Sequence, residues 1–197
     1  MARPPKFTES DLLDGARDAV LEHGLNATLA QVSALVGAPT GSLYHRFPSR
    51  DHLMVSLWLR SVRRFQTGYL VAARATDEQQ ALRDCAVYIP RYCRAFPADA
   101  RAMMLFRHSQ VAVTAPTSLR AEVQAVNDEV WAVLRGLAAR RYRVGDDTEL
   151  VLLVRAAVVQ APYGLVRPYV GGPVPEELDS IVVAAAQGIL ALGDTRP

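Results

Sequence analysis

The sequence has few of the residues that would point to a specific chemistry. Its 197 residues include two cysteines and a single lysine, Lys6, and aromatic residues make up 7%. On one helix, Cys85 and Cys93 would have α-carbons about 12 Å apart, which is too far for a disulfide. Neither belongs to a zinc-ligand spacing. We interpret both as small buried residues and keep a redox-sensing thiol as the alternative.

Long apolar runs are also missing. No uninterrupted stretch reaches the roughly 18–20 residues that a membrane helix needs. The first residues, MARPPKFTESDLL, contain no apolar segment of a secretory signal. We therefore expect no membrane partner and a cytoplasmic location. Half of the residues are hydrophobic, which predicts a globular protein with a sizeable core.

The excess of positive charge is small and lies in one part of the chain. The formal net charge is +2. Residues 1–65 contain eight Lys/Arg against six Asp/Glu, and the remaining residues contain fourteen of each. The whole excess therefore belongs to the N-terminal third, a weak electrostatic indication of nucleic-acid binding there.

Signatures of catalysis and of metal binding are absent from the sequence. There is no nucleophile elbow, glycine-rich phosphate loop or paired-carboxylate spacing. His45 and His52 are seven residues apart, but Pro48 interrupts any helix between them. We expect no metal site, no cofactor and no enzymatic activity.

A 3.6-residue apolar period recurs along the chain and predicts an all-α fold of about nine helices. Thr8 and Asp11 form a capping box for a first helix, which Gly24 ends. Thr28 can cap a short second helix that Gly37 ends. The later helices are expected near 77–95, 98–110, 117–141, 147–167 and 175–192, and Pro90 and Pro162 are expected to kink or split theirs.

The third helix is short and rich in polar groups. Pro39 suits its first turn, Leu43 and Phe47 anchor it, and Ser49 caps a longer fourth helix. Three short helices in about forty residues, the last two joined by a tight glycine-containing turn, are typical of the helix-turn-helix. In that motif the second helix of the pair enters the major groove, with its first residues at the base edges.

The polar residues divide by the chemistry they can offer to DNA. Thr40 and Ser42 can donate or accept hydrogen bonds at bases, and their small neighbours allow close approach. Tyr44, His45 and Arg50 are placed to reach phosphate oxygens. The predicted DNA-binding residues are Thr28, Pro39, Thr40, Gly41, Ser42, Tyr44, His45 and Arg50.

These residues carry a family resemblance. GSLYHRFPSRDHL resembles the signature of the tetracycline-repressor (TetR) family, whose usual form is close to GTLYHYF followed by a Ser-Lys-Glu-like start. The preceding LLDGARDAVLEHGLNATLAQVSALVGAPTGS is similar to the first two helices of that family, so the match covers residues 10–60. Three residues differ from those common in the family: Thr40 stands where lysine is common, Arg46 where a second tyrosine is common, and Arg50 where lysine is common. The gap from Gly24 to Gly37 is one residue shorter than in the commonest form of the family. Base specificity therefore cannot be transferred.

The resemblance implies an N-terminal helix-turn-helix DNA-binding domain at 1–60 and a C-terminal ligand-binding and dimerisation domain at 61–197, with a soft boundary near 60–70. It implies a homodimer on a pseudo-palindromic operator whose half-sites lie roughly 34–36 Å apart or somewhat more. The helices near 147–167 and 175–192 would pair with their mates. Two apolar stripes support this: Leu150, Leu153, Val154, Ala157, Val158 and Ala161, and Ile181, Val182, Ala185, Ile189 and Leu192.

The resemblance also implies a transcriptional regulator, which we expect to be a repressor released by a small apolar or amphipathic ligand. Candidate ligand-binding residues are Tyr88, Tyr92, Phe96, Met103, Phe106, Trp131 and Tyr163, with His108 and Gln160 as polar contacts. Two alternatives remain open. One is a small all-helical metabolite-binding protein or enzyme, and the other is a protein-binding adaptor with a vestigial helix-turn-helix.

Overall fold

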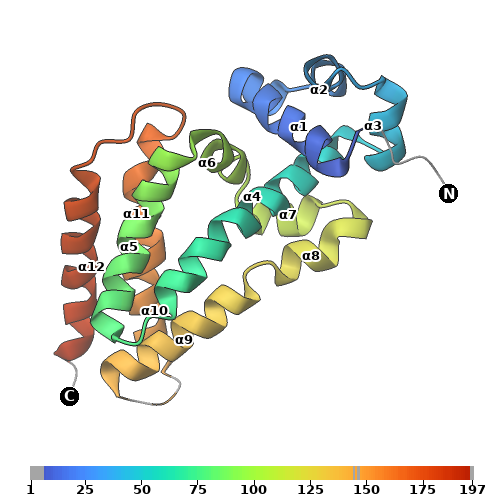
Figure 1. Cartoon of the computed structure of the whole chain (residues 1–197). Helices are drawn as coiled ribbons and strands as arrows, with labels where there is room; N and C mark the ends of the chain where they lie inside the picture. The colour runs from blue at the N-terminus through green and yellow to red at the C-terminus, as the bar shows by residue number, and fades with distance from the viewer. Residues whose placement is uncertain (1–6, 144, 146, 196–197) are drawn as a thin grey trace. The chain divides into compact units, whose positions relative to one another are not determined.

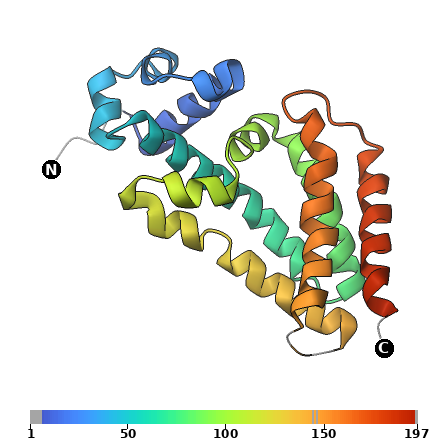
Figure 2. The same ribbon diagram turned by 180° about the vertical axis from the view of Figure 1, so that it is seen from behind.

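The computed structural model describes residues 7–143, 145 and 147–195. These residues are all-α, and no strand occurs among them (Figures 1 and 2), which confirms the predicted fold class. The helices are α1 (Glu9–His23), α2 (Leu29–Val36), α3 (Thr40–Arg46), α4 (Arg50–Ala73), α5 (Glu78–Ala95), α6 (Pro97–Met103), α7 (His108–Thr114), α8 (Arg120–Ala125), α9 (Asp128–Tyr142), α10 (Thr148–Arg155), α11 (Ala161–Val166) and α12 (Leu178–Asp194). Short 3₁₀ turns occupy Gly24–Asn26, Thr117–Leu119 and Arg167–Tyr169, and a π-helical turn at Ala156–Gln160 joins α10 to α11.

The chain folds into two compact units. The first contains the residues up to Val62 together with Ala98–Val126, and the second contains Arg63–Pro97 together with the chain from Asn127 onward. The sequence predicts a division into 1–60 and 61–197. The units differ from that division because α6, α7 and α8 pack with the N-terminal helices.

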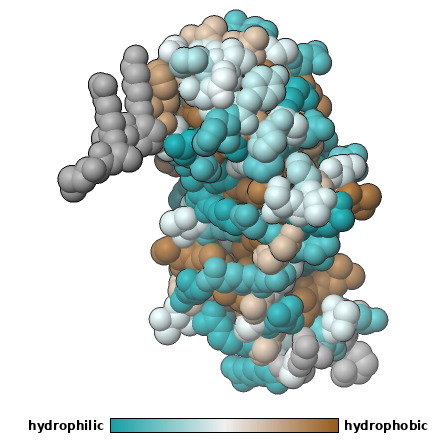
Figure 3. All heavy atoms as spheres, turned by 90° about the vertical axis from the view of Figure 1, so that its right-hand side faces the viewer, coloured by the Kyte–Doolittle hydropathy of each residue, from teal (hydrophilic) through white to brown (hydrophobic). Residues whose placement is uncertain are grey.

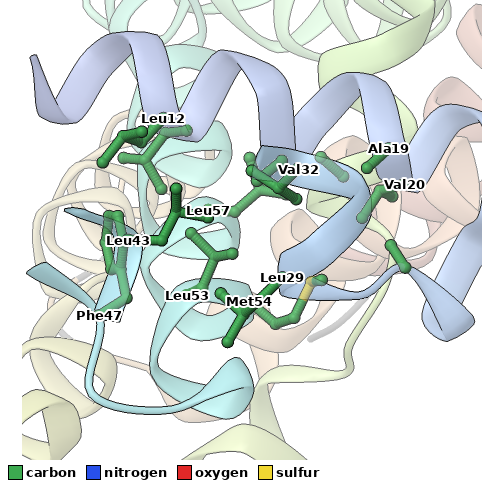
Figure 4. Close-up of a cluster of buried hydrophobic side chains, with 14 of the residues drawn as sticks. Leu12, Ala19, Val20, Leu29, Val32, Leu43, Phe47, Leu53, Met54 and Leu57 are labelled. Carbon is green, nitrogen blue, oxygen red and sulfur yellow. The ribbon is translucent and has the colours of Figure 1, made fainter. Parts of the chain in front are cut away.

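The first unit is built around a cluster of buried apolar side chains from α1 to α4 (Figure 4). Leu43 of α3 is fully buried and Phe47 is 2% exposed. Leu12 of α1 and Leu53 and Leu57 of α4 belong to the same cluster. Burying such a side chain contributes about 1.5–3 kcal/mol, so the two anchors predicted for α3 hold a short helix that could not be stable alone.

The first two helices start at the predicted capping residues, Thr8 and Thr28, and both starts are capping boxes. The Thr8 hydroxyl accepts a hydrogen bond from the Asp11 N–H (3.2 Å), and the Asp11 carboxylate accepts one from the Thr8 N–H (2.8 Å). Thr28 and Gln31 form the same pair of bonds at the start of α2. Gly37 ends α2 in the left-handed region, with φ +67°, a conformation that glycine adopts without steric cost.

The crossing of α1 and α2 depends on the absence of a side chain at one position. A Cβ placed on Gly15 would lie 2.1 Å from Cγ2 of Val36 and 3.6 Å from the Val32 carbonyl oxygen. Carbon atoms in contact prefer a separation of about 3.5–4.0 Å. Glycine at this position therefore allows α2, and with it the turn into α3, to lie close against α1.

The prediction of one helix at 98–110 is wrong. The chain leaves α6 after Met103 and starts α7 at His108, and Arg107 at the start of α7 has extended backbone. Leu105 and Phe106, in the intervening turn, pack against the cluster of the first unit. The packing of these two partly buried side chains explains why the turn replaces a continuous helix, since tertiary packing commonly overrides local propensity.

The second unit contains the other long helices. The prolines inside two of them have different outcomes. α5 is not split at Pro90 and runs as one α-helix. At Pro162 the chain forms the π-helical turn directly before the proline, a known way to accommodate a missing backbone donor. The predicted helix at 117–141 is interrupted between α8 and α9.

An ion-pair cluster ties α12 to α5 within the second unit. Arg91 and Arg94 both donate to the Asp179 carboxylate at 2.7 Å, and Arg94 also donates to the Pro175 carbonyl at 2.9 Å. Burial opposes ionisation of Asp179, but these hydrogen bonds and charges outweigh it, so the pKa of Asp179 is lowered. The cluster therefore stabilises the start of α12 most at a pH where this carboxyl is ionised.

Part of the second unit's apolar surface is exposed. The helical stretch Thr148–Tyr169 is long and apolar enough to cross a membrane by length and composition, and 33% of its most apolar window is buried in this chain. A single stretch of this kind is weak evidence for a membrane, because a helix that packs against another subunit passes the same test. The face drawn in Figure 3 mixes hydrophilic side chains with hydrophobic patches.

Candidate nucleic-acid interface

Helix α3 presents most of the predicted DNA-binding residues on its exposed side. Thr40, Gly41, Ser42, Tyr44 and His45 are all exposed, whereas Leu43 and the following Phe47 are buried in the first unit. Anchoring on one side fixes the direction of the other. The structure therefore brings together, on one short helix, exposed side chains that carry two hydroxyl groups, a phenol and an imidazole.

Tyr44 and His45 are available to an external partner. The Tyr44 side chain is 53% exposed, and neither its hydroxyl nor the His45 ring has a hydrogen-bond partner among the described residues. Arg46, one residue further, lies 3.9 Å from the Glu9 carboxylate. An exposed phenol and imidazole one turn after the first residues of α3 suit phosphate oxygens beside the bases.

An open groove lies beside this helix in the first unit. It has a volume of about 680 Å³. It is lined by Phe7, Leu12, Gly37, Pro39, Gly41, Ser42, His45 and Arg46. Four of the predicted DNA-binding residues therefore border one concave surface.

Thr28 and Arg50 have structural partners of their own. The Thr28 hydroxyl is engaged in the capping box of α2. The Arg50 guanidinium donates from Nε to the Ala27 carbonyl at 2.8 Å and from Nη2 to the Leu25 carbonyl. Its phosphate contact stays a prediction, and the geometry gives Arg50 a second role. It links the start of α4 to the turn that precedes α2.

Sequence reasoning missed one residue of this surface. Ser33 of α2 lies under the start of α3, where its Oγ is 2.5 Å from the Ala38 carbonyl oxygen and 3.2 Å from the Thr40 Oγ1. Nothing in the local pattern marks Ser33, because the contact exists only once the Gly37 turn has folded α3 back onto α2.

The predicted ligand-binding residues lie in different units. Met103 and Phe106 belong to the first unit, where they pack on the apolar cluster around Trp58. His108 is there too, with its ring stacked on Trp58 (centroids 6.2 Å apart) and Nε2 2.9 Å from the Val123 carbonyl oxygen. These three residues take part in the packing of α6 to α8, which the sequence does not reveal.

The other predicted ligand-binding residues belong to the second unit. Tyr88 and Tyr92 of α5 form a continuous series of ring contacts with Phe65 and Tyr69 of α4, and Phe96, directly after α5, extends the series through Tyr92; the ring centroids are 5.1–6.1 Å apart. The Trp131 ring is covered by the Arg155 guanidinium, 4.4 Å from the ring centroid. Tyr163 is half-buried on α11 and Gln160 is exposed. Their role in ligand binding stays a prediction.

The second unit also has an open groove of about 460 Å³ that is lined by none of these residues. It is formed by side chains from or beside α5, α9 and α12. The lining residues are Asp77, Gln79, Gln80, Leu82, Arg83, Arg141, Val183, Ala186, Gln187 and Leu190.

The two cysteines are buried in α5. Burial raises the pKa of both the Cys85 and the Cys93 thiol to about 12, and both thiols are free. Because the thiolate is the reactive form, these side chains suit the interpretation as small buried residues better than that of redox sensors.

Helix α2, the tight turn at Gly37 and the short anchored helix α3 with its exposed polar face form a helix-turn-helix. Residues 12–57 match the family described as bacterial regulatory proteins, tetR family. This match covers the part of the chain that contains the helix-turn-helix, and the all-helical fold of the chain is similar to that of a solved transcriptional regulator.

Solved structures show the same fold over almost the whole chain. A transcriptional regulator from Rhodococcus sp. Rha1 is 21% identical with a TM-score of 0.73, covering 97% of this chain and 100% of that one. The TetR family regulator PfmR from Thermus thermophilus is 20% identical with a TM-score of 0.69, covering 91% and 97%. The fatty acid degradation regulator FadR from Bacillus halodurans is 17% identical with a TM-score of 0.70, covering 93% and 98%. No curated protein sequence matches the chain.

Proposed function

We propose that this protein is a homodimeric transcriptional repressor that binds a pseudo-palindromic operator through α3 and leaves it when a small apolar or amphipathic ligand binds. The observation that carries the proposal is the division of α3. Leu43 and Phe47 anchor the helix in the core, and the polar residues between and before them face outward. The family match of residues 12–57 supports it.

In this proposal α3 enters the major groove with its first turn at the base edges. Thr40 and Ser42 contact bases, and the absence of a side chain at Gly41 allows close approach. Tyr44 and His45 contact phosphates on the flanking backbone. Arg50 holds the turn before α2 in place, so that the start of α2, with Thr28, lies at the phosphate backbone.

Dimerisation is supported by apolar side chains that one chain leaves uncovered. Leu152 of α10 is 55% exposed, and Ile181 and Leu192 of α12 are 46% and 60% exposed. Gly188 is on the same side of α12 as Ile181 and Leu192, and a Cβ added to it would have no atom within 4 Å. That open space leaves room for a second helix to approach closely. Two such faces, one on each of the predicted helices, suit a bundle of four helices formed by two copies.

The dimer is tested by analytical ultracentrifugation of wild type and of Leu192→Glu. Wild type should sediment with twice the mass of the chain, and Leu192→Glu should shift towards the monomer. Val71→Glu is the matched control, because Val71 is 72% exposed but lies on α4. A monomeric wild type, or equal dissociation of both variants, would contradict the proposed interface.

The ligand class follows from the kind of side chains predicted to line the site. Tyr88, Tyr92, Phe96, Trp131 and Tyr163 offer aromatic surface with a few polar groups, as in sites for apolar or amphipathic molecules. The B. halodurans relative in fold is a fatty acid degradation regulator, so fatty acids of graded chain length are the first molecules to test.

The ligand is tested by measuring release of a fluorescent operator duplex as each fatty acid is added. Phe96→Ala should weaken the response to an active compound and leave duplex affinity unchanged. Tyr169→Ala provides the control, because Tyr169 is an exposed aromatic residue of the second unit outside the predicted set. Equal effects of the two variants would argue against the predicted site.

DNA binding itself is tested by selecting duplexes from a random pool with purified protein and measuring the affinity of the winners at several salt concentrations. The proposal expects a two-fold symmetric sequence and an affinity that falls steeply with salt. A ligand-binding protein without a DNA role would select no sequence, and an adaptor with a vestigial motif would behave in the same way.

A further inference from the structure

The two hydroxyl groups at the start of α3 have different surroundings. The Thr40 Oγ1 lies 3.2 Å from the Ser33 Oγ, which in turn lies 2.5 Å from the Ala38 carbonyl oxygen. The Ser42 hydroxyl, two residues further along α3, has no hydrogen-bond partner in the described part of the chain. Thr40 is therefore part of a fixed chain of hydrogen bonds, whereas Ser42 can rotate.

Counting protons fixes the direction of that chain. A hydroxyl has one proton to donate and two lone pairs to accept with, and a carbonyl oxygen can only accept. The Ser33 proton must therefore point at the Ala38 oxygen. Ser33 can then only accept from Thr40, so the Thr40 proton points at Ser33. What Thr40 presents to the outside, where its side chain is exposed, is lone pairs alone.

We infer that Thr40 reads DNA as a hydrogen-bond acceptor only, and that Ser33 is the positioning residue that gives it this polarity. The inference rests on the proposed function of α3. In the major groove the donors are the exocyclic amines, N6 of adenine and N4 of cytosine, whereas O6 and N7 of guanine and O4 of thymine are acceptors. The base under Thr40 is therefore adenine or cytosine, contacted at its amine.

Every base pair presents one exocyclic amine and one keto oxygen in the major groove, so exchanging natural bases never removes the amine alone. The inference is therefore tested with base analogues. In the selected duplex, each adenine is replaced in turn by purine and each cytosine by 2-pyrimidinone, which lack the exocyclic amine. Wild type should lose about 3-fold to 10-fold in affinity at one position in each half-site, the range of a single net hydrogen bond. Thr40→Val, which keeps the shape without the hydroxyl, should be indifferent to the same replacement, and Thr40→Ser should respond like wild type.

Ser33→Ala separates positioning from a merely structural role. Without Ser33 the Thr40 hydroxyl can rotate and also donate, so the protein should accept the exchanged base pair at that one position and discriminate as before at all others. In a Thr40→Val background, Ser33→Ala should change no base preference. Ser42→Ala is the matched control and should alter a different position.

Several results would overturn the inference. One is a Thr40-dependent position that responds to loss of a keto oxygen, or of N7 in a 7-deazapurine, instead of an amine. Another is a Ser33→Ala protein that loses affinity by one common factor on every duplex, as a structural role requires. Absence of binding to any duplex would overturn the proposed function as well, so the two failures are distinguishable.

Discussion

Replacing Gly15 by alanine tests the packing that places the helix-turn-helix. The new Cβ would lie 2.1 Å from Cγ2 of Val36, far inside the optimal carbon–carbon separation of about 3.5–4.0 Å. Val36 is β-branched and has one strongly preferred rotamer in a helix, so it cannot turn away freely. Either the valine leaves its rotamer or α2 moves away from α1.

The loss of stability expected from Gly15→Ala can be measured against the same substitution at a glycine where the added methyl group meets no atom. Alanine is the better helix former, which favours any Gly→Ala change in a helix by roughly 1 kcal/mol. At Gly136 of α9 no atom lies within 4 Å of the new Cβ, so Gly136→Ala should show that gain alone. Gly15→Ala adds an overpacking cost of about 1–3 kcal/mol, and this cost should appear as the difference between the two variants.

Urea unfolding at fixed protein concentration measures both variants, and a double-mutant cycle with Val36→Ala identifies the cause. Val36→Ala removes Cγ2, so Gly15→Ala should cost about 1–3 kcal/mol less in that background. Duplex affinity should fall with Gly15→Ala because α3 follows α2. If Gly15→Ala is as stable as Gly136→Ala, or if Val36→Ala does not relieve it, the close crossing of α1 and α2 is refuted.

Three substitutions and one chemical labelling experiment test other parts of the structure. Tyr44→Phe should weaken binding about 2-fold to 10-fold on every duplex, as loss of a phosphate contact does; a changed base preference would contradict that role. Arg50→Lys keeps the charge but loses the two-carbonyl geometry, so it should lower the unfolding midpoint, whereas a pure phosphate contact predicts unchanged stability. Cys85 and Cys93 should resist thiol reagents at pH 8 in the folded protein and react in denaturant, because burial raises the pKa of both thiols to about 12. Rapid reaction of the folded protein would contradict their burial. Asp179→Asn should lower the free energy of unfolding at pH 7 by about 1 kcal/mol. Because the pKa of Asp179 is lowered in the folded protein, the difference in stability between the variant and wild type should shrink as the pH falls below about 4. A stability difference that does not depend on pH would exclude the ion-pair explanation.

What could be predicted from the sequence is mostly local. The capping roles of Thr8 and Thr28 follow from side chains that satisfy backbone groups within four residues. The end of α2 at Gly37 follows from the left-handed backbone conformation that glycine adopts without steric cost. The burial of Leu43 and Phe47 follows from helical spacing. These local rules define the helix-turn-helix and the face of α3 that carries its polar groups.

The features that the sequence did not predict depend on contacts between distant residues. Arg50 is hydrogen-bonded to carbonyls more than twenty residues away. The turn after α6 forms because Phe106 packs against the buried apolar clusters of the first unit. Ser33 meets Thr40 only after the chain has turned. No periodicity reports such contacts, because they arise when the helices are brought together.

Affinity for DNA as a function of salt tests the central claim most directly. Purified protein is titrated into its selected duplex, and into a scrambled duplex of the same length, by fluorescence anisotropy from low to physiological salt. The account predicts tighter binding to the selected duplex at every salt concentration and a linear fall of log affinity with log salt for both. Failure to bind either duplex at low salt, or equal binding to both throughout, would contradict it.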